Sequence, residues 1–277
     1  MNSFGASATS RQSQWSLEGQ NFVVTGGAKG IGLATVKELL SLGASSVLFC
    51  SRGACDDLLS VLHDSFPDQQ IIHVICDVST HDGRETLVQK SKASFRTING
   101  LVNNVGTNVR KNILEQTEEE YYTMCRTNID SAYFLCRLFS DLFDPNGASI
   151  VNVSSAAGSQ SSGTGAAYGL TKAAINQFTK ILACEWASRK IRVNAVTPWM
   201  TMTPMLEEAI RKNPKQIEKV LAWTPMHRLA TAEEIAAPIT FLCLPASSYI
   251  TGQILGIDGG LTAQGFDGPC VSPDTSS

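Results

Sequence analysis

No apolar run in this chain approaches the roughly 18 residues that a membrane-spanning helix requires. The chain also lacks an excess of either charge, because 22 Lys and Arg stand against 25 Asp and Glu, for a net charge of −3. Proteins that bind nucleic acid usually carry a clustered basic face. We therefore expect neither a membrane nor a nucleic acid among the partners of this protein.

The chain contains no Cys-x-x-Cys pair, although it has eight cysteines. The cysteines are scattered through apolar segments, as reduced cysteines of a buried core are. This pattern supports neither a zinc site nor a disulfide framework. We predict no metal site and a reducing compartment.

The first 16 residues lack the apolar core of a secretory signal. They are polar and rich in serine, and we expect them to form a flexible N-terminal tail on a cytoplasmic protein. Organelle targeting by this tail stays open, because transit peptides are also rich in serine and poor in acids. Residues 267–277 are expected to form a second tail.

Between the tails, short apolar runs alternate with segments of helical period. The expected strands are 22–25, 47–50, 71–76, 100–103, 150–153, 192–196 and 254–257. The expected helices are 30–42, 55–66, 82–94, 117–143, 165–188 and 231–243. Several strands are apolar on both faces, as in a parallel sheet covered by helices on each side. The pattern predicts one doubly wound α/β domain of Rossmann type over residues 17–266, with a seven-stranded parallel sheet.

Residues 199–226 interrupt this alternation. They are rich in Pro, Met and Trp. We expect them to form a small helical flap over the edge where the strands end, which is where ligands bind in such folds.

A glycine-rich segment, 25–32 (Thr-Gly-Gly-Ala-Lys-Gly-Ile-Gly), joins the first strand to the first helix. A helix N-terminus favours an anion, and glycines let a pyrophosphate approach the backbone. The spacing matches neither the common Gly-x-Gly-x-x-Gly fingerprint nor a Walker A loop. A glycine-rich turn without a ligand is the alternative. The cofactor contacts expected here are Gly26, Lys29, Gly30, Ile31 and Gly32.

The second strand ends without the acidic residue that would bind the ribose 2′-OH of NAD. Ser51 and Arg52 stand there instead, and Lys29 would face the same group. Two cations and a hydroxyl suit the dianionic 2′-phosphate of NADP, so we predict NADP (NADPH) rather than NAD. The alternative is that Arg52 is a solvated loop residue.

Two further strand ends carry polar residues. Asp77, followed by Val78, ends the third strand and could accept a hydrogen bond from an adenine amino group. A helix-capping aspartate is the alternative. Asn103 ends the fourth strand and Gly106 follows it, where a turn could bring the backbone to the cofactor, although a plain Asx turn is also consistent.

Proton-transfer chemistry is indicated by Ser155, Tyr168 and Lys172. Tyr168 and Lys172 are four residues apart, so they share one helix face. A lysine ammonium is expected to lower the pKa of the phenol, which could then exchange a proton with a substrate oxygen near neutral pH. Ser155 could hydrogen-bond the same oxygen. The alternative is an exposed helix face with a solvated lysine and a half-buried tyrosine.

With these residues assembled, the chain resembles the short-chain dehydrogenase/reductase family over about residues 17–266. The matching segments are 25–32, 103–106, 194–198 and 258–260, together with Ser155 and Tyr168-x-x-x-Lys172. The resemblance implies a fourth catalytic residue at Asn128, which supports a water-linked proton path, and it selects Ser155 over Ser154. It also implies that Tyr168 is the general acid and that Lys172 holds the nicotinamide ribose.

Within the family, segments 102–108, 185–187 and 241–253 are similar to the tropinone-reductase-like group. That resemblance implies NADPH and reduction of a ketone to a secondary alcohol. It also implies a homodimer or homotetramer that packs through the helices near 117–143 and 165–188 and through the C-terminal strand.

One departure from the family pattern concerns the nicotinamide end of the site. The family usually has Pro-Gly after the sixth strand, whereas this chain has Pro198 and Trp199. Thr203 matches the family's cofactor-contacting threonine. Trp199 adds bulk and is expected to contact the substrate together with Ser155 and Tyr168. Arg110 and Lys111 lie near the expected pocket rim, where they could hold a carboxylate.

Three functions remain open from the sequence. The first is an NADPH-dependent reductase of a small, largely apolar ketone. The second is a 3-oxoacyl carrier-protein reductase. The third is a non-catalytic subunit that binds the cofactor within a larger assembly, which Trp199 weakly favours and the intact catalytic residues oppose.

Overall fold

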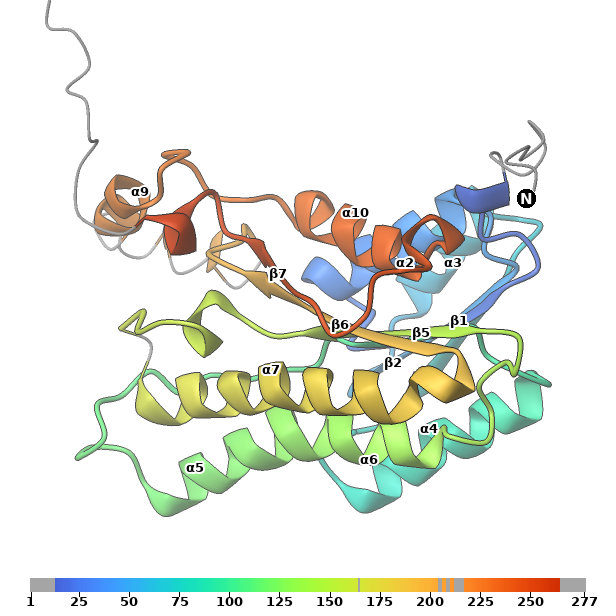
Figure 1. Ribbon diagram of the computed structural model, residues 1–277, viewed down its shortest axis with the longest axis horizontal. Coiled ribbons are helices and arrows are strands. Elements are labelled where there is room, and N and C mark those ends of the chain that lie inside the picture. The colour runs from blue at the N-terminus through green and yellow to red at the C-terminus, as the bar shows by residue number, and fades with distance from the viewer. Residues whose placement is uncertain (1–12, 164, 204–205, 208–209, 212–216, 265–277) are drawn as a thin grey trace, which may run out of the picture.

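The computed structural model describes residues 13–163, 165–203, 206–207, 210–211 and 217–264. Seven parallel strands form one sheet in the order β3-β2-β1-β4-β5-β6-β7 (Figure 1). They are β1 Asn21–Thr25, β2 Ser46–Ser51, β3 Gln70–Ile75, β4 Gly100–Asn103, β5 Ala148–Val153, β6 Ile191–Pro198 and β7 Ile254–Ile257. All seven expected strands are present, with bounds that shift by no more than two residues.

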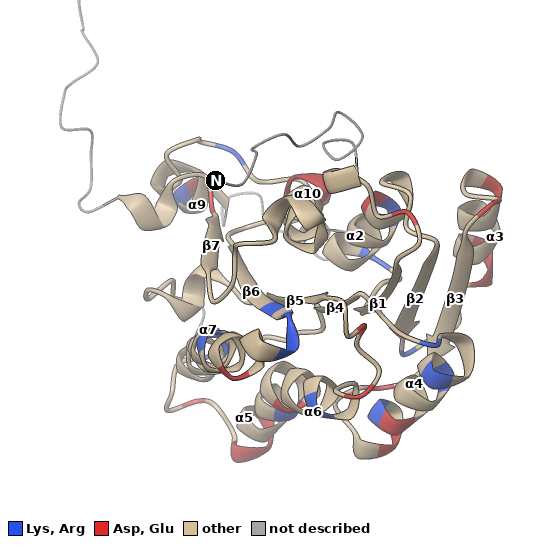
Figure 2. Cartoon of the chain, turned by 45° about the vertical axis from the view of Figure 1, so that its right-hand side comes forward, with Lys and Arg blue, Asp and Glu red and all other residues tan. Residues whose placement is uncertain are grey.

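Helices cover both faces of the sheet. One layer contains α2 Gly30–Ser41, α3 Asp56–Ser65 and α10 Ala232–Cys243. The other contains α4 His81–Ser94, α5 Glu118–Cys125, α6 Ser131–Leu138 and α7 Ala166–Trp186. Figure 2 looks along the layers, with α2, α3 and α10 above the sheet and α4 to α7 below it. Two separate apolar cores follow from this arrangement, one on each face.

The central strands are buried on both faces, which explains their near-continuous apolar sequences. Every residue of β4 and β5 is buried, and β1 is buried from Phe22 to Thr25. The chain winds outward in one direction from β1 to β3 and in the other from β4 to β7. The point of reversal lies between β1 and β4, and ligands bind there in doubly wound sheets.

The helix expected at 117–143 is shorter and interrupted. It begins with a capping box, in which Thr117 accepts from the Glu120 amide and Glu120 accepts from the Thr117 amide. A π-helical turn, Arg126–Asp130, separates α5 from α6, and α6 ends at Leu138 rather than 143. Single π turns inside helices often mark functional sites, and this one contains Asn128.

The expected flap is described only in part, because positions 204–205, 208–209 and 212–216 lie outside the described residues. Within it, α9 spans Glu218–Trp223, and Thr201 forms a parallel bridge with Ala230. The two expected tails lie largely outside the described residues. Trp15, near the end of the first, stacks on Phe241 with ring centroids 6.0 Å apart. None of the described helices has the length and apolarity needed to cross a bilayer.

Candidate active site

The glycine-rich loop between β1 and α2 is packed too tightly for side chains. Gly26 has a φ of 69°, which favours glycine. A Cβ on Gly32 would lie 2.2 Å from the Gly26 carbonyl oxygen. Lys29 is the N-cap residue of α2 and makes no side-chain cap, so its exposed side chain can reach a ligand at the helix N-terminus. The loop therefore has the form of an anion-binding turn.

Asn104 holds this loop from the neighbouring strand. Its Nδ2 donates to the carbonyls of Thr25 at 2.9 Å and Gly26 at 3.3 Å. The Thr25 hydroxyl in turn accepts from the amides of Asn104 at 2.9 Å and Val105 at 3.1 Å. Asn104 falls within segment 103–106, which carries part of the family resemblance, but the sequence alone assigns it no role. The only local signal for a role of Asn104 is that it directly follows Asn103 at the end of β4.

The two asparagines face different ways. Asn103 is buried, and its Nδ2 donates to Asn152 Oδ1 at 2.9 Å, while Asn152 donates to Thr179 Oγ1 at 2.9 Å. The side chain of Asn103 thus ties β4 to β5 and, through Asn152, to α7. Its Oδ1 has no hydrogen-bond partner but is buried, so the side chain is not available at the sheet edge.

At the end of β2, Ser51 and Arg52 lie as expected, Ser51 partly buried and Arg52 exposed. The Ser51 hydroxyl donates to the Gly53 carbonyl at 2.8 Å and lies 2.7 Å from His73 Nε2 on β3. Burial lowers the pKa of His73, so the neutral ring can donate its Nε2 hydrogen to Ser51. His73 was not singled out in the sequence, because its position beside Ser51 depends on the pairing of β2 with β3.

At the end of β3, the carboxylate of Asp77 accepts from the Ser79 amide at 2.9 Å. The N-cap of α4 is Thr80, which accepts from Gly83, so Asp77 is not the helix cap considered as its alternative. The Val78 side chain is buried in the core, and its carbonyl accepts from Arg84 at 3.0 Å.

Asn128 joins the loop after β4 to α7. Its Oδ1 accepts from the Thr107 amide at 2.7 Å, and its Nδ2 donates to the Thr107 carbonyl and the Thr171 hydroxyl, each at 2.9 Å. Thr171 lies between Tyr168 and Lys172 on α7. The π turn therefore fixes the position of the loop relative to the helix that carries both residues.

The hydrogen bonds of Ser154 and Ser155, which follow β5, show which of the two serines is available to a substrate. Ser154 is buried and donates to the Lys172 carbonyl at 3.0 Å. Ser155 is less buried and accepts from the Ala157 amide at 3.2 Å, and its hydroxyl contacts the Tyr168 phenol. Ser154 therefore holds α7 against β5, and Ser155 is the serine available to a substrate.

Lys172 is 4% exposed, and its Nζ donates to the Val153 carbonyl at 2.8 Å. The same nitrogen lies 5.8 Å from the centre of the Tyr168 ring. A Cβ on Gly106 would lie 3.2 Å from Lys172 Nζ, so glycine leaves room for the ammonium group. The loop after β4 thus touches both the glycine-rich loop and Lys172, which brings the predicted cofactor and catalytic residues to one edge.

The pKa of Tyr168 differs from the sequence expectation. Burial raises it, and the groups that oppose this are the Ser155 hydroxyl and the charge of Arg110 rather than Lys172. Burial also lowers the pKa of Lys172 to about 8. The expected lowering of the Tyr168 pKa by Lys172 is therefore wrong for this structure, because desolvation outweighs it.

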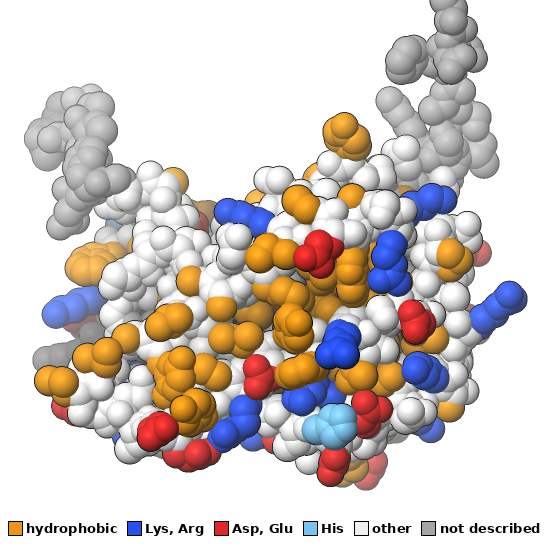
Figure 3. Space-filling view, turned by 60° about the horizontal axis from the view of Figure 1, so that its bottom comes forward, with side chains coloured by type: hydrophobic (Ala, Val, Ile, Leu, Met, Phe, Trp, Pro, Cys, Tyr) orange, Lys and Arg blue, Asp and Glu red, His pale blue; other side chains and the backbone are white. Residues whose placement is uncertain are grey.

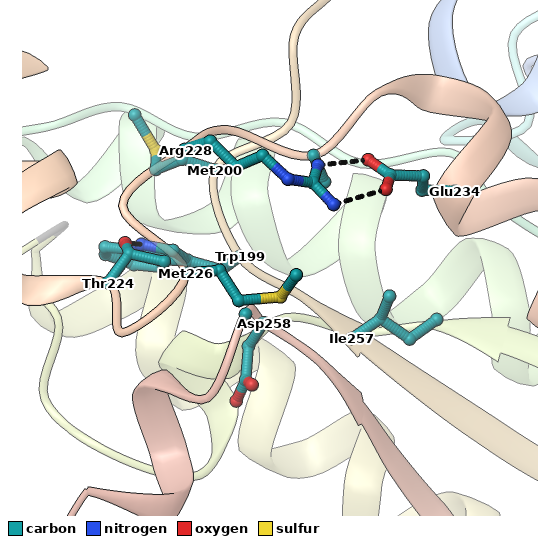
Figure 4. Close-up of a pocket in the computed structure, with 10 residues that line it drawn as sticks. Trp199, Met200, Thr224, Met226, Arg228, Glu234, Ile257 and Asp258 are labelled. Carbon is teal, nitrogen blue, oxygen red and sulfur yellow. Dashed lines mark hydrogen bonds and ion pairs between the residues drawn. The ribbon is translucent and has the colours of Figure 1, made fainter.

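Beyond β6, Trp199 turns toward the flap. Its indole Nε1 donates to Thr224 Oγ1 at 3.1 Å, and both residues line a cavity of about 90 Å³ between β7 and α10 (Figure 4). The Arg228–Glu234 ion pair lies on the α10 side of this cavity. Its described lining includes neither Ser155 nor Tyr168. Pro198 ends β6, and the Thr203 methyl lies 3.5 Å from the position of a Cβ on Gly30, beside the glycine-rich loop.

Comparison with known proteins gives a consistent result. A family model described as enoyl-(acyl carrier protein) reductase matches residues 26–262. A tropinone reductase homologue of Arabidopsis thaliana is 44% identical over 256 residues, which cover 91% of this chain and 96% of that protein. Another from the same plant, named as chloroplastic, is 42% identical over 262 residues, which cover 94% and 80%.

Among solved structures, L-sorbose reductase from Gluconobacter frateurii, complexed with NADPH and L-sorbose, matches with a TM-score of 0.83. It is 27% identical, and the match covers 91% of this chain and 99% of that one. The family model spans the chain from the glycine-rich loop to just beyond β7.

Proposed function

Because this chain belongs to the short-chain dehydrogenase/reductase family, we propose that it reduces a small, largely apolar ketone to a secondary alcohol with NADPH. It is an NADP-dependent oxidoreductase of this family, similar to the tropinone reductase homologues. The observation that carries the proposed reaction is the meeting of Ser155, Tyr168 and Lys172 beside the glycine-rich loop.

The residues present fit a dinucleotide. The crowded Gly32 and the open N-terminus of α2 form a cradle that a side chain would fill. We assign the pyrophosphate to this loop, the 2′-phosphate to Lys29, Ser51 and Arg52, and the adenine to the Asp77–Val78 turn. The remaining proposed contacts, toward the nicotinamide, are Asn103, Gly106, Tyr168, Lys172, Pro198 and Thr203.

When bound, NADPH supplies the hydride that reaches the carbonyl carbon. Tyr168 donates its phenolic proton to the carbonyl oxygen, and the Ser155 hydroxyl hydrogen-bonds the same oxygen. The raised pKa of Tyr168 keeps the phenol protonated at neutral pH, which is the form that reduction requires. Lys172 holds the nicotinamide ribose. Asn128 supports the water-linked path that returns a proton to Tyr168. Its Oδ1 accepts one hydrogen bond, from the Thr107 amide, and can accept a second from a water.

The test is consumption of NADPH and of NADH with a panel of cyclic ketones, 1,2-diketones and an acyl thioester. We expect NADPH to be consumed, NADH to be consumed more slowly, and Tyr168→Phe to lose at least about a hundredfold of the rate, the usual contribution of a general acid. Retained activity in Tyr168→Phe would contradict the catalytic assignment. A preference for NADH would contradict the assignment of Lys29 and Arg52 to the 2′-phosphate.

Two other functions are separated by the same experiment. The second candidate is a 3-oxoacyl carrier-protein reductase, because the description of the matching family model names an acyl carrier protein reductase. It predicts that the acyl thioester is the best substrate in the panel. A non-catalytic subunit would bind NADPH tightly and reduce no member of the panel.

We also propose that the protein is a homodimer or homotetramer. Exposed apolar side chains gather on α5, α6 and α7, and Figure 3 shows hydrophobic atoms grouped on this lower face. They are Tyr121, Tyr122, Tyr133, Leu170 and Ile181. Large exposed apolar patches usually mark interaction sites. Leu255 on β7 is also exposed and supports a second contact through the C-terminal strand.

The proposed compartment is the cytoplasm. The reduced cysteines among the described residues are consistent with it. A chloroplast location is the alternative, given the name of one relative. Fractionation of cells that express the full chain with a C-terminal fluorescent tag separates the two, because import would place the signal in plastids.

A further inference from the structure

Two adjacent cations on the loop after β4 have different surroundings. Lys111 Nζ forms an ion pair with Glu120 at 2.5 Å. The guanidinium of Arg110 instead lies against a thioether, with Nη2 3.9 Å from Met200 Sδ. Within the described part of the chain, no carboxylate forms an ion pair with Arg110.

The loop that carries Arg110 lies against the start of α7. A Cβ on Gly165, the residue before α7, would lie 2.8 Å from the Lys111 carbonyl oxygen and 3.6 Å from that of Val109. The loop is therefore packed against the start of the helix whose third residue is Tyr168. From this loop the Arg110 side chain reaches Met200, so it links the loop at the start of α7 to the segment that follows β6.

The electrostatics agree with this placement. The charge of Arg110 is among the influences that lower the pKa of Tyr168. An exposed cation that has no carboxylate ion-pair partner among the described residues, and whose charge acts on Tyr168, attracts anions toward the catalytic residues. A guanidinium pairs with a carboxylate through two parallel hydrogen bonds.

We propose that the preferred substrate is a ketone that carries a carboxylate on an otherwise apolar body, and that Arg110 binds this carboxylate while Tyr168 and Ser155 hold the ketone. This inference rests on the proposed ketone reduction and specifies its substrate class. It predicts that cationic amino ketones are disfavoured, because the same guanidinium repels them.

The test compares 4-oxocyclohexanecarboxylate with its methyl ester, which has the same ring and ketone without the charge. We expect the wild-type kcat/KM to favour the carboxylate by about tenfold or more, the effect of one charge-assisted pair. Arg110→Gln should remove this preference and its dependence on salt, so that the carboxylate and the ester are reduced with similar kcat/KM. Lys111→Gln is the matched control, because Lys111 is already paired with Glu120.

A binding measurement makes the result independent of turnover. Cyclohexanecarboxylate should bind the NADPH-loaded protein in calorimetry, and Arg110→Gln should weaken that binding by about tenfold or more. Equal binding to wild type and Arg110→Gln, or an equal carboxylate-to-ester ratio in the two proteins, would overturn the inference about Arg110. Ketone reduction itself would still stand if the ester were reduced, so the two failures are distinguishable.

Discussion

Lys172 is a cation that the fold holds out of water, with the Val153 carbonyl as its hydrogen-bond acceptor. Burial lowers its pKa from 10.5 to about 8. In the unfolded chain it regains its ordinary pKa, so between about pH 8 and 10.5 the unfolded state binds a proton that the folded state has lost. The stability contributed by this group therefore rises with pH through that window and is lowest below pH 8.

Burial of the charged Lys172 lowers the stability of the folded protein, so Lys172→Met is predicted to raise it. The shift of 2.5 units, from 10.5 to about 8, corresponds to about 3 kcal/mol. Lys172→Met also loses the hydrogen bond to Val153, which offsets roughly 1–2 kcal/mol of this gain in unfolding free energy. We expect the variant to be inactive but about 1–2 kcal/mol more stable than wild type at pH 7, measured by urea unfolding without cofactor.

The difference in unfolding free energy should narrow as the pH rises from 8 to 10.5. A constant difference over that range would show that Lys172 is not titrating with a lowered pKa. Lys172→Arg, which keeps the charge, serves as the comparison, since it should show no gain in stability at pH 7.

At the scale of elements, the β1–α2 loop and the loop after β4 form one unit through Asn104. Gly32→Ala tests this unit, because its Cβ would lie 2.2 Å from the Gly26 carbonyl oxygen and 2.6 Å from Asn104 Nδ2. Neither atom can move without opening the loop. We expect NADPH affinity to fall by at least about tenfold, measured by fluorescence titration, because the pyrophosphate loses its backbone donors.

Gly53→Ala is the control for that substitution. Gly53 lies near the proposed 2′-phosphate contact, but a Cβ there meets nothing within 4 Å and its φ does not require glycine. Its affinity for NADPH should equal that of wild type. If Gly32→Ala binds NADPH equally well, the glycine-rich loop is not the pyrophosphate site.

At the scale of the whole molecule, the exposed apolar face on α5, α6 and α7 predicts self-association. Tyr133 on α6 is 49% exposed and packs against Phe178 of α7, with ring centroids 5.5 Å apart. Tyr133→Glu would place a charge in the proposed interface, where burying it without a partner costs several kcal/mol. We expect light scattering after size exclusion to report a smaller assembly than wild type.

Val61→Glu provides the matched control, because Val61 is similarly exposed, at 55%, but lies on α3 in the opposite helix layer. It should leave the assembly unchanged, and circular dichroism should show both variants folded. A wild-type protein that is monomeric at micromolar concentration would refute the proposed oligomer.

The amino-acid sequence by itself determined the seven strands, most helix bounds and the position of the glycine-rich turn. These features depend on local properties: apolar runs, helical period, capping residues such as Thr117, and glycines between a strand and a helix. The four-residue spacing of Tyr168 and Lys172 likewise placed both on one face of α7. The identity of Asn128 as a candidate came from family resemblance, since nothing local distinguishes it from other helical asparagines.

Tertiary structure alone decided where the side chains at the strand ends point. Asn103 points into the core, whereas Asn104 points to the glycine-rich loop. Ser154 hydrogen-bonds the Lys172 carbonyl, and the Trp199 indole hydrogen-bonds Thr224. Tertiary structure also brought Arg110 near Tyr168, and it buried Lys172 fully and Tyr168 in part, so that desolvation governs each pKa. These outcomes depend on neighbours that are far away in the chain, because burial and hydrogen-bond partners exist only once the strands and helices have packed.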